Sequence, residues 1–128
     1  MKHFLADSNV FIRVFVKDNP KQTVEVLKYF ENAKNGKIKI TVLSEIIPEI
    51  EYVLHKVYKI DKQEIAGDLK SICLSNYLNL EQKTVWLKTL KLYEKNNVDL
   101  IDAFLYQNKL TRKAKILSFD EDFKKIKA

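Results

Sequence analysis

The sequence predicts an α/β protein, a three-layer α/β/α sandwich around a short, mainly parallel central sheet. Three observations lead to this fold class. Short apolar or alternating segments, typical of strands, are separated by longer segments with apolar side chains at helical spacing. Only two glycines and two prolines interrupt the 128 residues, so few loops are expected. Hydrophobic residues make up 46% of the chain, which is enough for the core of a single domain spanning residues 1–128.

The first predicted strand is the apolar run at residues 3–6, which ends at Asp7. The apolar segment 9–15 begins the first helix. A second helix follows the "DNPKQ" stretch, where Asn19 is a capping residue and Pro20 suits the first helical position, with Gln22 completing a capping box. We expect Gly36 to end this helix in a left-handed conformation.

The second strand is predicted at residues 37–41, an alternating and β-branched segment from which Thr41 is available to cap the next helix. That helix has an apolar stripe that begins at Ile46. Pro48 inside the stripe predicts either a kink or a later helix start. The stripe consists of Ile46, Ile47, Ile50, Val53, Leu54, Val57 and Tyr58.

The second half of the chain continues the alternation. Asp61 with Glu64 is a capping box, and opens a helix along Ile65, Leu69, Ile72 and Tyr77. Residues 78–81 are a candidate third strand. Two helices are predicted next, over 83–95 with Trp86, Leu90 and Tyr93 on one face, and from Asp99 through Leu110. Residues 115–119, "KILSF", are predicted to be the last strand, followed by a terminal helix over 121–127.

The composition limits the classes of partner and the compartment. The formal charge is +6, which favours a polyanionic partner such as RNA or DNA, although a lysine-rich solvated surface explains it equally well. Cys73 is the single cysteine, which excludes an internal disulfide and a CxxC metal site. No apolar stretch reaches the length of a membrane span, and Asp7 and Arg13 interrupt any signal-peptide core. We therefore expect a soluble, cytoplasmic protein.

Acidic side chains lie where the predicted strands end. Asp7 directly follows the first strand, Glu45 lies shortly after the second, and Asp120 directly follows the last. Ligands of parallel α/β sheets bind outside the carboxyl ends of the strands, so these acids are expected to gather at one end of the sheet. Carboxylates without His or Cys partners suit Mg²⁺ or Mn²⁺ rather than zinc. The chemistry that such a site predicts is metal-assisted phosphodiester hydrolysis.

Four blocks of the sequence, taken in order, resemble the VapC-type toxins of the PIN-domain family. They are "ADSNVFIRVFVKDNPKQ", "TVLSEIIPEIEYVLHKVYKIDKQEI", "VDLIDAFL" and "LSFDEDF", and together they span essentially the whole chain. The resemblance implies a PIN-like α/β/α sandwich and a Mg²⁺- or Mn²⁺-dependent endoribonuclease. It also implies an RNA substrate, a VapB-like antitoxin that holds the toxin inactive, and a homodimer.

The resemblance also assigns roles to individual residues. Asn9 matches the small polar residue that orients the first acid, and Ser118 matches the hydroxyl residue before the last one. Asp99 matches a frequent additional acid and is a further candidate metal ligand. Arg13 matches a basic position that is a candidate for substrate binding. The acidic quartet of the family, catalytic and metal-ligating, is matched by Asp7, Glu45, Asp102 and Asp120.

Each candidate also has a purely structural explanation. Asp7 and Asp120 stand where they would cap helices, and Asp99 is as well explained by a helix cap as by a metal site. Arg13 is equally well explained by a surface ion pair. For Glu49, Glu51 and Asp122 we expect solvated surface positions.

A second function class is a non-catalytic PIN-like module that binds RNA or a protein partner. It predicts RNA binding that is insensitive to EDTA and to Asp7→Asn. The complete set of acids in this sequence argues against it. The run from Lys109 through Lys115 and the lysine-rich tail are candidates for an RNA path in either class.

Overall fold

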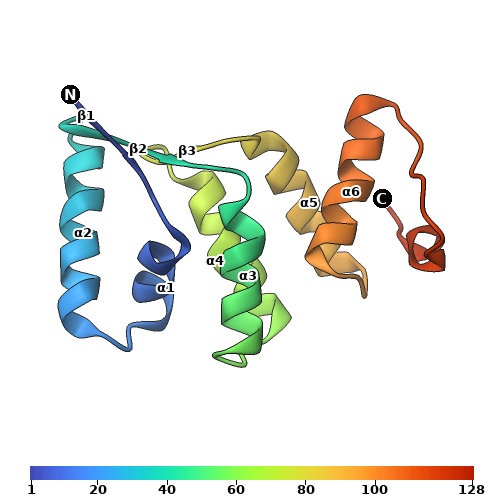
Figure 1. Cartoon of the computed structure of the whole chain (residues 1–128), viewed down its shortest axis with the longest axis horizontal. Helices are drawn as coiled ribbons and strands as arrows, with labels where there is room; N and C mark the ends of the chain where they lie inside the picture. The colour runs from blue at the N-terminus through green and yellow to red at the C-terminus, as the bar shows by residue number, and fades with distance from the viewer.

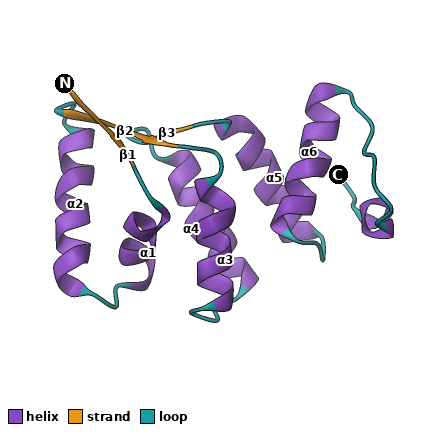
Figure 2. Cartoon of the chain, in the orientation of Figure 1, coloured by secondary structure: helices purple, strands orange, loops and turns teal.

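The computed structural model describes residues 1–128, the whole chain, as an elongated α/β structure (Figure 1). Six α-helices and three strands follow one another along the chain, with a final short 3₁₀ helix (Figure 2). The elements are β1 (Lys2–Leu5), α1 (Ser8–Val16), α2 (Pro20–Lys34), β2 (Ile38–Val42), α3 (Ile46–Lys56), α4 (Lys62–Leu74), β3 (Asn79–Leu80), α5 (Lys83–Lys95), α6 (Leu100–Arg112) and η1 (Glu121–Lys125).

The sheet is parallel and has three strands in the order β1-β2-β3. Leu5 pairs with Thr41 between β1 and β2, and Val42 pairs with Leu80 between β2 and β3. The predicted α/β/α class and its parallel sheet are confirmed, as is the short strand within residues 78–81. β1 lies at one edge of the sheet, so one side of its backbone has no strand beside it.

Local sequence signals set most helix ends. The Asn19 side chain accepts a hydrogen bond from the Gln22 backbone N–H, and Asp61 accepts one from Glu64. Gly36 has φ +73°, a left-handed conformation that a side chain would disfavour, and it follows the end of α2 as predicted. These helix ends can be predicted from sequence because each capping side chain contacts backbone within three residues of itself.

For α3, one expectation is wrong, and one of two open alternatives is confirmed. Thr41 does not cap this helix, because it is paired within β2, and its hydroxyl contacts His3 Nε2 instead. The helix begins at Ile46, with Glu45 in the N-cap position. Pro48 therefore lies in the first turn, where its missing N–H has no helical partner to lose. The later start, rather than a kink, accounts for this proline.

The core extends from the sheet into α5 and α6. Trp86 is almost fully buried, and its ring stacks on Phe104 of α6 with centroids 4.2 Å apart. Its Nε1 donates to Ser44 Oγ at 2.8 Å, and the Ser44 hydroxyl donates to Gln82 Oε1. This single side chain therefore joins the sheet region to the last two helices.

None of the helices combines the length and the apolar composition that a membrane-spanning segment needs.

The end of the chain differs most from the prediction. Residues 115–119 form a loop and not a strand, and the expected terminal helix is limited to η1. The loop and η1 lie beyond α6, at the end of the molecule opposite β1 (Figure 1). Leu117 and Phe119 are 101% and 104% exposed. The apolar pattern of a strand is present, but no neighbouring strand in the chain pairs with it.

Candidate metal centre

Asp7 stands at the junction of β1 and α1. Its carboxylate accepts a hydrogen bond from the Ser8 backbone N–H at 2.8 Å, which caps α1. Asn9 is exposed on the first turn and makes no hydrogen bond to Asp7, so the orienting contact comes from Ser8. The Ser8 hydroxyl donates to Glu49 at 3.0 Å, which ties the start of α1 to α3. The position of Asp7 at the start of α1 is therefore fixed, and its carboxylate is exposed to solvent.

Glu45 is exposed at the N-terminus of α3, after β2, and its side chain makes no capping bond. Of the two neighbouring acids that we expected to be solvated, Glu49 is exposed and Glu51 is half-buried, and both accept a side-chain hydrogen bond. Glu49 accepts from Ser8, and Glu51 accepts from the Tyr93 hydroxyl at 3.0 Å. Helical spacing alone did not reveal these partners, because both belong to other elements.

Three carboxylates meet between α6 and η1. One oxygen from each of Asp102, Asp120 and Asp122 lies within 4.8 Å of the others. Asp102 is half-buried in the first turn of α6, whereas Asp120 and Asp122 are exposed. Burial, and then the charges of Asp99 and of the other two members, raises the pKa of Asp102. Repulsion among fixed carboxylates of this kind is relieved by a cation.

The turn that supplies Asp120 is held by its own side chains. The Asp120 backbone N–H donates to Ser118 Oγ at 3.0 Å, and Asp120 accepts from the Asp122 backbone N–H at 2.9 Å. Asp120 is thus the N-cap of η1, and Ser118 supports it, although neither follows a strand. Asp122, expected to be a surface residue, is the member of the cluster that sequence reasoning did not assign to the site.

A cleft of about 510 Å³ adjoins this cluster, lined by α3, α5 and the start of α6. Asp99 lies in it at the N-cap position of α6 and makes no side-chain capping bond, so capping alone does not explain it. The Lys62 side chain also lines this cleft, and its ammonium group donates a hydrogen bond to the Asn96 carbonyl. Burial lowers the pKa of Lys62, and the charges of Asp99 and Glu51 oppose that shift.

The structure brings some of the predicted site residues together and leaves others apart. Asp102 and Asp120 share one cluster, to which neither Asp7 nor Glu45 belongs. The expected gathering of all the acids at one sheet end is therefore not present within this single chain. Arg13 donates to Asp18 at 2.8 Å, which is the surface ion pair that we considered for it.

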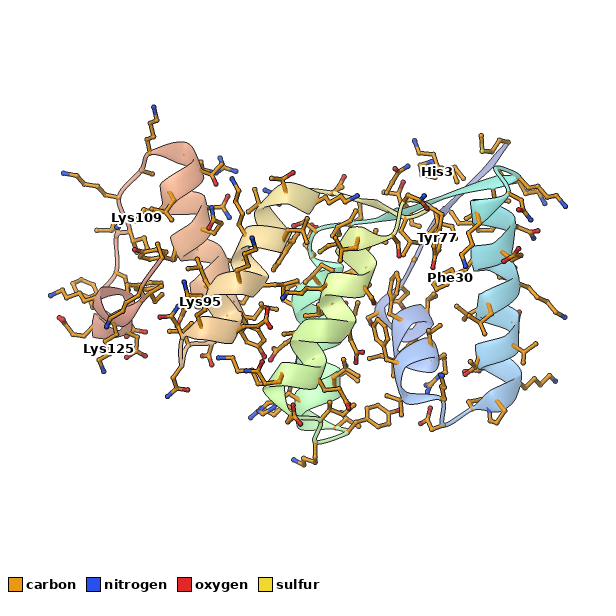
Figure 3. The ribbon with its side chains drawn as sticks, turned by 180° about the vertical axis from the view of Figure 1, so that it is seen from behind. His3, Phe30, Tyr77, Lys95, Lys109 and Lys125 are labelled. Atoms are coloured by element: carbon orange, nitrogen blue, oxygen red, sulfur yellow. The ribbon has the colours of Figure 1, made fainter.

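Basic side chains line a separate face of α6 and the loop after it. Lys109, Arg112 and Lys115 border a cleft of about 430 Å³ together with Phe104 and Ile116. Lys95, Lys109 and Lys125 all lie toward the C-terminal end of the molecule (Figure 3). The predicted run from Lys109 to Lys115 is thus accessible to a polyanion.

The donor set suits a hard divalent cation. All three members of the cluster offer carboxylate oxygens, and no histidine or cysteine is among them. Mg²⁺ and Mn²⁺ prefer such ligands, whereas zinc and copper sites use nitrogen or sulfur. The cluster therefore fits an ion of this class.

Comparison with known proteins gives two results. The family model described as PIN domain matches residues 4–128. A curated protein of Aquifex aeolicus, named VapC ribonuclease, is 26% identical over 124 residues, which covers 95% of this chain and 90% of the relative. The family match spans every acid discussed above.

Proposed function

The chain belongs to the PIN-domain family, and from this premise we propose that it is a metal-dependent endoribonuclease toxin of a VapBC-type pair. The observation that supports this most directly is the convergence of Asp102, Asp120 and Asp122 within 4.8 Å. The name of the Aquifex relative supports ribonuclease activity as the reaction. The proposed substrate is RNA, and the proposed bond is the phosphodiester.

We assign the acids to metal binding and catalysis. Asp102 and Asp120 would hold Mg²⁺ or Mn²⁺ together with Asp122. Asp7 and Glu45, which lie outside this cluster in the structure, would act as further catalytic and metal-binding acids in an arrangement that brings them to it. A bound divalent ion supplies Lewis-acid stabilisation of charge at phosphorus and a lowered pKa for water. The turn through Ser118 fixes the Asp120 carboxylate. Asp99 is placed to add negative charge beside Asp102, which strengthens the attraction for a cation.

Basic groups would bind the substrate backbone. Lys109, Arg112 and Lys115 face one cleft, so they would contact successive phosphates of RNA without reading its sequence. Arg13 is engaged by Asp18, and its contribution to RNA binding would require release from that ion pair. We therefore expect the α6 face to account for most of the salt dependence of binding.

The proposed partner is a VapB-like antitoxin. The acidic cleft near Asp99 and Asp102 attracts cations, so an antitoxin that inserts a basic side chain there would block the metal. Such a contact would inhibit the enzyme without any change in its fold.

The test is cleavage of total transfer RNA by purified, antitoxin-free protein in Mg²⁺ or Mn²⁺. We expect discrete fragments that disappear with EDTA and in the variants Asp102→Asn and Asp7→Asn. Asp61→Asn is the matched control, because it removes an exposed acid that belongs neither to the cluster nor to the lining of the cleft beside it, and Asn still caps the helix. This variant should cleave like the wild type.

The alternative outcome is equally clear. RNA binding that persists in EDTA and in Asp7→Asn, with no cleavage of transfer RNA, ribosomal RNA or message, would favour the non-catalytic binding module. Equal loss of cleavage in Asp61→Asn would show that the acids act through stability or net charge and not through a metal site.

A further inference from the structure

The acids of the cluster come from two elements that the chain joins by a loop. Asp102 belongs to the first turn of α6, whereas Asp120 and Asp122 lie at the start of η1. The loop of residues 115–119 makes no backbone–backbone hydrogen bond, so it does not fix η1 against α6. The position of η1 therefore depends on contacts made by the residues after it.

The tail that follows η1 is tied to the rest of the molecule. Ile126 is buried, and Phe123 is half-buried against the core. The next residue, Lys127, is bonded through its backbone to the side chain of Asn96. Its N–H donates to Asn96 Oδ1 at 2.9 Å, and its carbonyl accepts from Asn96 Nδ2 at 3.1 Å. Apolar packing has no preferred direction, so these two bonds set the course of the tail beside α6 (Figure 1).

Asn96 is itself held in place by three other bonds. It is the C-cap residue of α5, where its backbone N–H and its Nδ2 each donate to the Leu92 carbonyl at 3.0 Å. Its own carbonyl accepts from Lys62 of α4, whose ammonium group lies 4.5 Å from the centroid of the Tyr93 ring. Every polar group of Asn96 therefore has a partner within the chain, which makes this residue a rigid support.

The place of Asn96 in the chain gives it contact with both parts of the cluster. Its main chain leads through a short turn into Asp99 and α6, which contains Asp102. Its side chain holds the tail directly after η1, which contains Asp120 and Asp122. No other side chain makes hydrogen bonds to both of these segments.

Fixing the tail matters because the carboxylates repel one another. Asp120 and Asp122 are exposed, and the hydrogen bonds within their own turn set only its local shape. A loose tail would let the turn move away from Asp102 and relieve that repulsion. An ion that binds carboxylates already in place does not have to order them, so its affinity is higher.

We propose that Asn96 is a positioning residue of the metal site. By bonding the backbone of Lys127, it fixes the tail to the end of α5 and so holds Asp120 and Asp122 within reach of Asp102. The effect on metal binding rests on the proposed function, whereas the link between Asn96 and the tail does not.

The link is tested first, in the absence of metal. Asn96→Ala removes both bonds to Lys127, and amide hydrogen exchange followed by NMR reports on that segment. The Lys127 amide should exchange about tenfold faster than in the wild type, because it loses its acceptor. Asn35→Ala is the matched control. Asn35 is the C-cap residue of α2 but bonds only through its backbone, so its variant should exchange like the wild type.

The effect on the site is tested by titration with Mn²⁺, followed by electron paramagnetic resonance. Asn96→Ala should bind Mn²⁺ about tenfold more weakly than the wild type, and Asp102→Asn should lose the tight site. In RNA cleavage, Asn96→Ala should need about tenfold more Mn²⁺ for half the maximal rate. Its rate at saturating Mn²⁺ should stay close to that of the wild type. A general loss of structure would instead lower that rate and leave the Mn²⁺ dependence unchanged.

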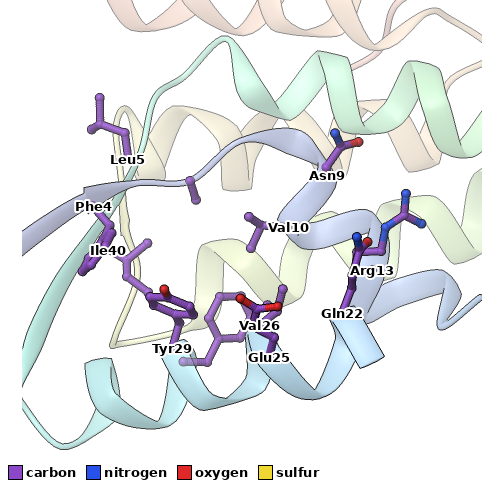
Figure 4. Close-up of a pocket in the computed structure, with 12 residues that line it drawn as sticks. Phe4, Leu5, Asn9, Val10, Arg13, Gln22, Glu25, Val26, Tyr29 and Ile40 are labelled. Carbon is purple, nitrogen blue, oxygen red and sulfur yellow. The ribbon is translucent and has the colours of Figure 1, made fainter. Parts of the chain in front are cut away.

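Glu25→Gln controls for Mn²⁺ that binds to scattered surface acids. Glu25 is exposed on α2 and does not belong to the acidic cluster. It borders an apolar cavity of about 320 Å³ at the β1 end of the molecule, where it lies on α2 between Gln22 and Tyr29 (Figure 4). Its removal should leave the affinity for Mn²⁺ unchanged.

A second variant removes the same bond from the other partner. Lys127→Pro deletes the N–H that donates to Asn96, and Ile126 already has the extended backbone, at φ −76° and ψ 129°, that a following proline requires. It should weaken Mn²⁺ binding, whereas Lys127→Ala, which keeps the N–H, should not. Combining Asn96→Ala with Lys127→Pro should cost little more than Asn96→Ala alone, because both act on one contact. Should Asn96→Ala fail to fold, Lys127→Pro decides the question.

The outcomes separate this inference from the proposed function. Wild-type affinity for Mn²⁺ in an Asn96→Ala chain with faster exchange at Lys127 would overturn the positioning role, and unchanged exchange would overturn the link itself. A wild type that binds Mn²⁺ through Asp102 and Asn96 but cleaves no RNA would refute the nuclease and leave the positioning role standing. A wild type that binds no Mn²⁺ would refute both.

Discussion

The sheet half of the chain, residues 1–80, and the helical arm, residues 81–128, position their acids by different means. In the sheet half, Asp7 and Glu45 follow paired strands, and Asp7 is bonded to the backbone of the next residue. In the arm, Asp120 depends on a hydroxyl and a backbone N–H within its own turn. The residues just before that turn have no backbone partner.

This difference shows which half is complete by itself. The sheet half has its hydrogen bonds in place, and its free edge is the only unpaired side of β1. The arm is anchored at α5 and α6 but ends in two uncovered apolar side chains, Leu117 and Phe119. The two halves are joined by the buried contact through Trp86, and also by the Tyr93–Glu51 and Lys62–Asn96 hydrogen bonds.

Removing the buried contact should have the largest effect. Trp86→Ala deletes the stack on Phe104 and the bond to Ser44, and we expect a loss of ~3–5 kcal/mol in the free energy of unfolding. Chemical denaturation followed by circular dichroism measures it. Tyr52→Ala, at an aromatic that is 60% exposed, is the control and should change stability by less than ~0.5 kcal/mol. Equal effects of the two variants would show that Trp86 does not join the halves.

A smaller change tests the polar part of the same contact. Ser44→Ala leaves both Trp86 Nε1 and Gln82 Oε1 without a partner, and the buried indole N–H should cost about 1–3 kcal/mol. Ser71→Ala is the matched control, because that serine is exposed and bonds only within its own helix. Denaturant midpoints of both variants measure the cost. A Ser44→Ala midpoint equal to that of the wild type would contradict the prediction, and would mean that water bonds to Trp86 Nε1 in place of the hydroxyl.

The same contrast explains which elements could be predicted from sequence. Asn19, Gly36 and Asp61 mark helix ends through contacts a few residues away, so the chain itself shows them. Residues 115–119 have the composition of a strand, but a strand also needs an edge to pair with. Local pattern cannot state where that edge lies. The expected strand is thus wrong for the single chain.

The site follows the same rule. Strand ends and family blocks predict Asp7, Glu45, Asp102 and Asp120 as site residues, and their assignment stays a prediction for the cleavage assay to test. The contribution of Asp122 to the cluster was missed, because it depends on the η1 turn folding against α6. The partners of Glu49 and Glu51 were missed because Ser8 and Tyr93 come from distant segments.

Helix caps distinguish the two halves on a smaller scale. Asp61→Ala removes a side-chain bond to the α4 backbone and should cost about 1 kcal/mol. Asp99→Ala removes no such bond, and it also relieves repulsion of Asp102, so it should cost clearly less. Urea midpoints compare the two variants. If Asp99→Ala keeps its stability but loses cleavage, Asp99 serves the metal site; equal costs for both would instead make it a structural cap.

The smallest expected effect concerns a carboxyl of the sheet half that has no role in the proposed site. Burial, and then the charge of Glu64, raises the pKa of Asp68 to about 6, above its ordinary value of 3.8. Folding therefore disfavours the charged form of Asp68. The contribution of this group to the free energy of unfolding falls as the pH rises from about 4 to about 6. Asp68→Asn should stabilise the protein at pH 8 by no more than ~1 kcal/mol, since partial exposure screens the effect.

At pH 4 the gain from Asp68→Asn should largely vanish, because the aspartate is then protonated in the folded state and partly so in the unfolded chain. Thermal unfolding at both pH values, with and without Mg²⁺, measures the difference. Magnesium should leave the Asp68 effect unchanged, whereas it should offset the repulsion around Asp102. An equal gain at both pH values would trace the effect to packing, and a gain abolished by Mg²⁺ would mean that the sheet half has a cation site of its own.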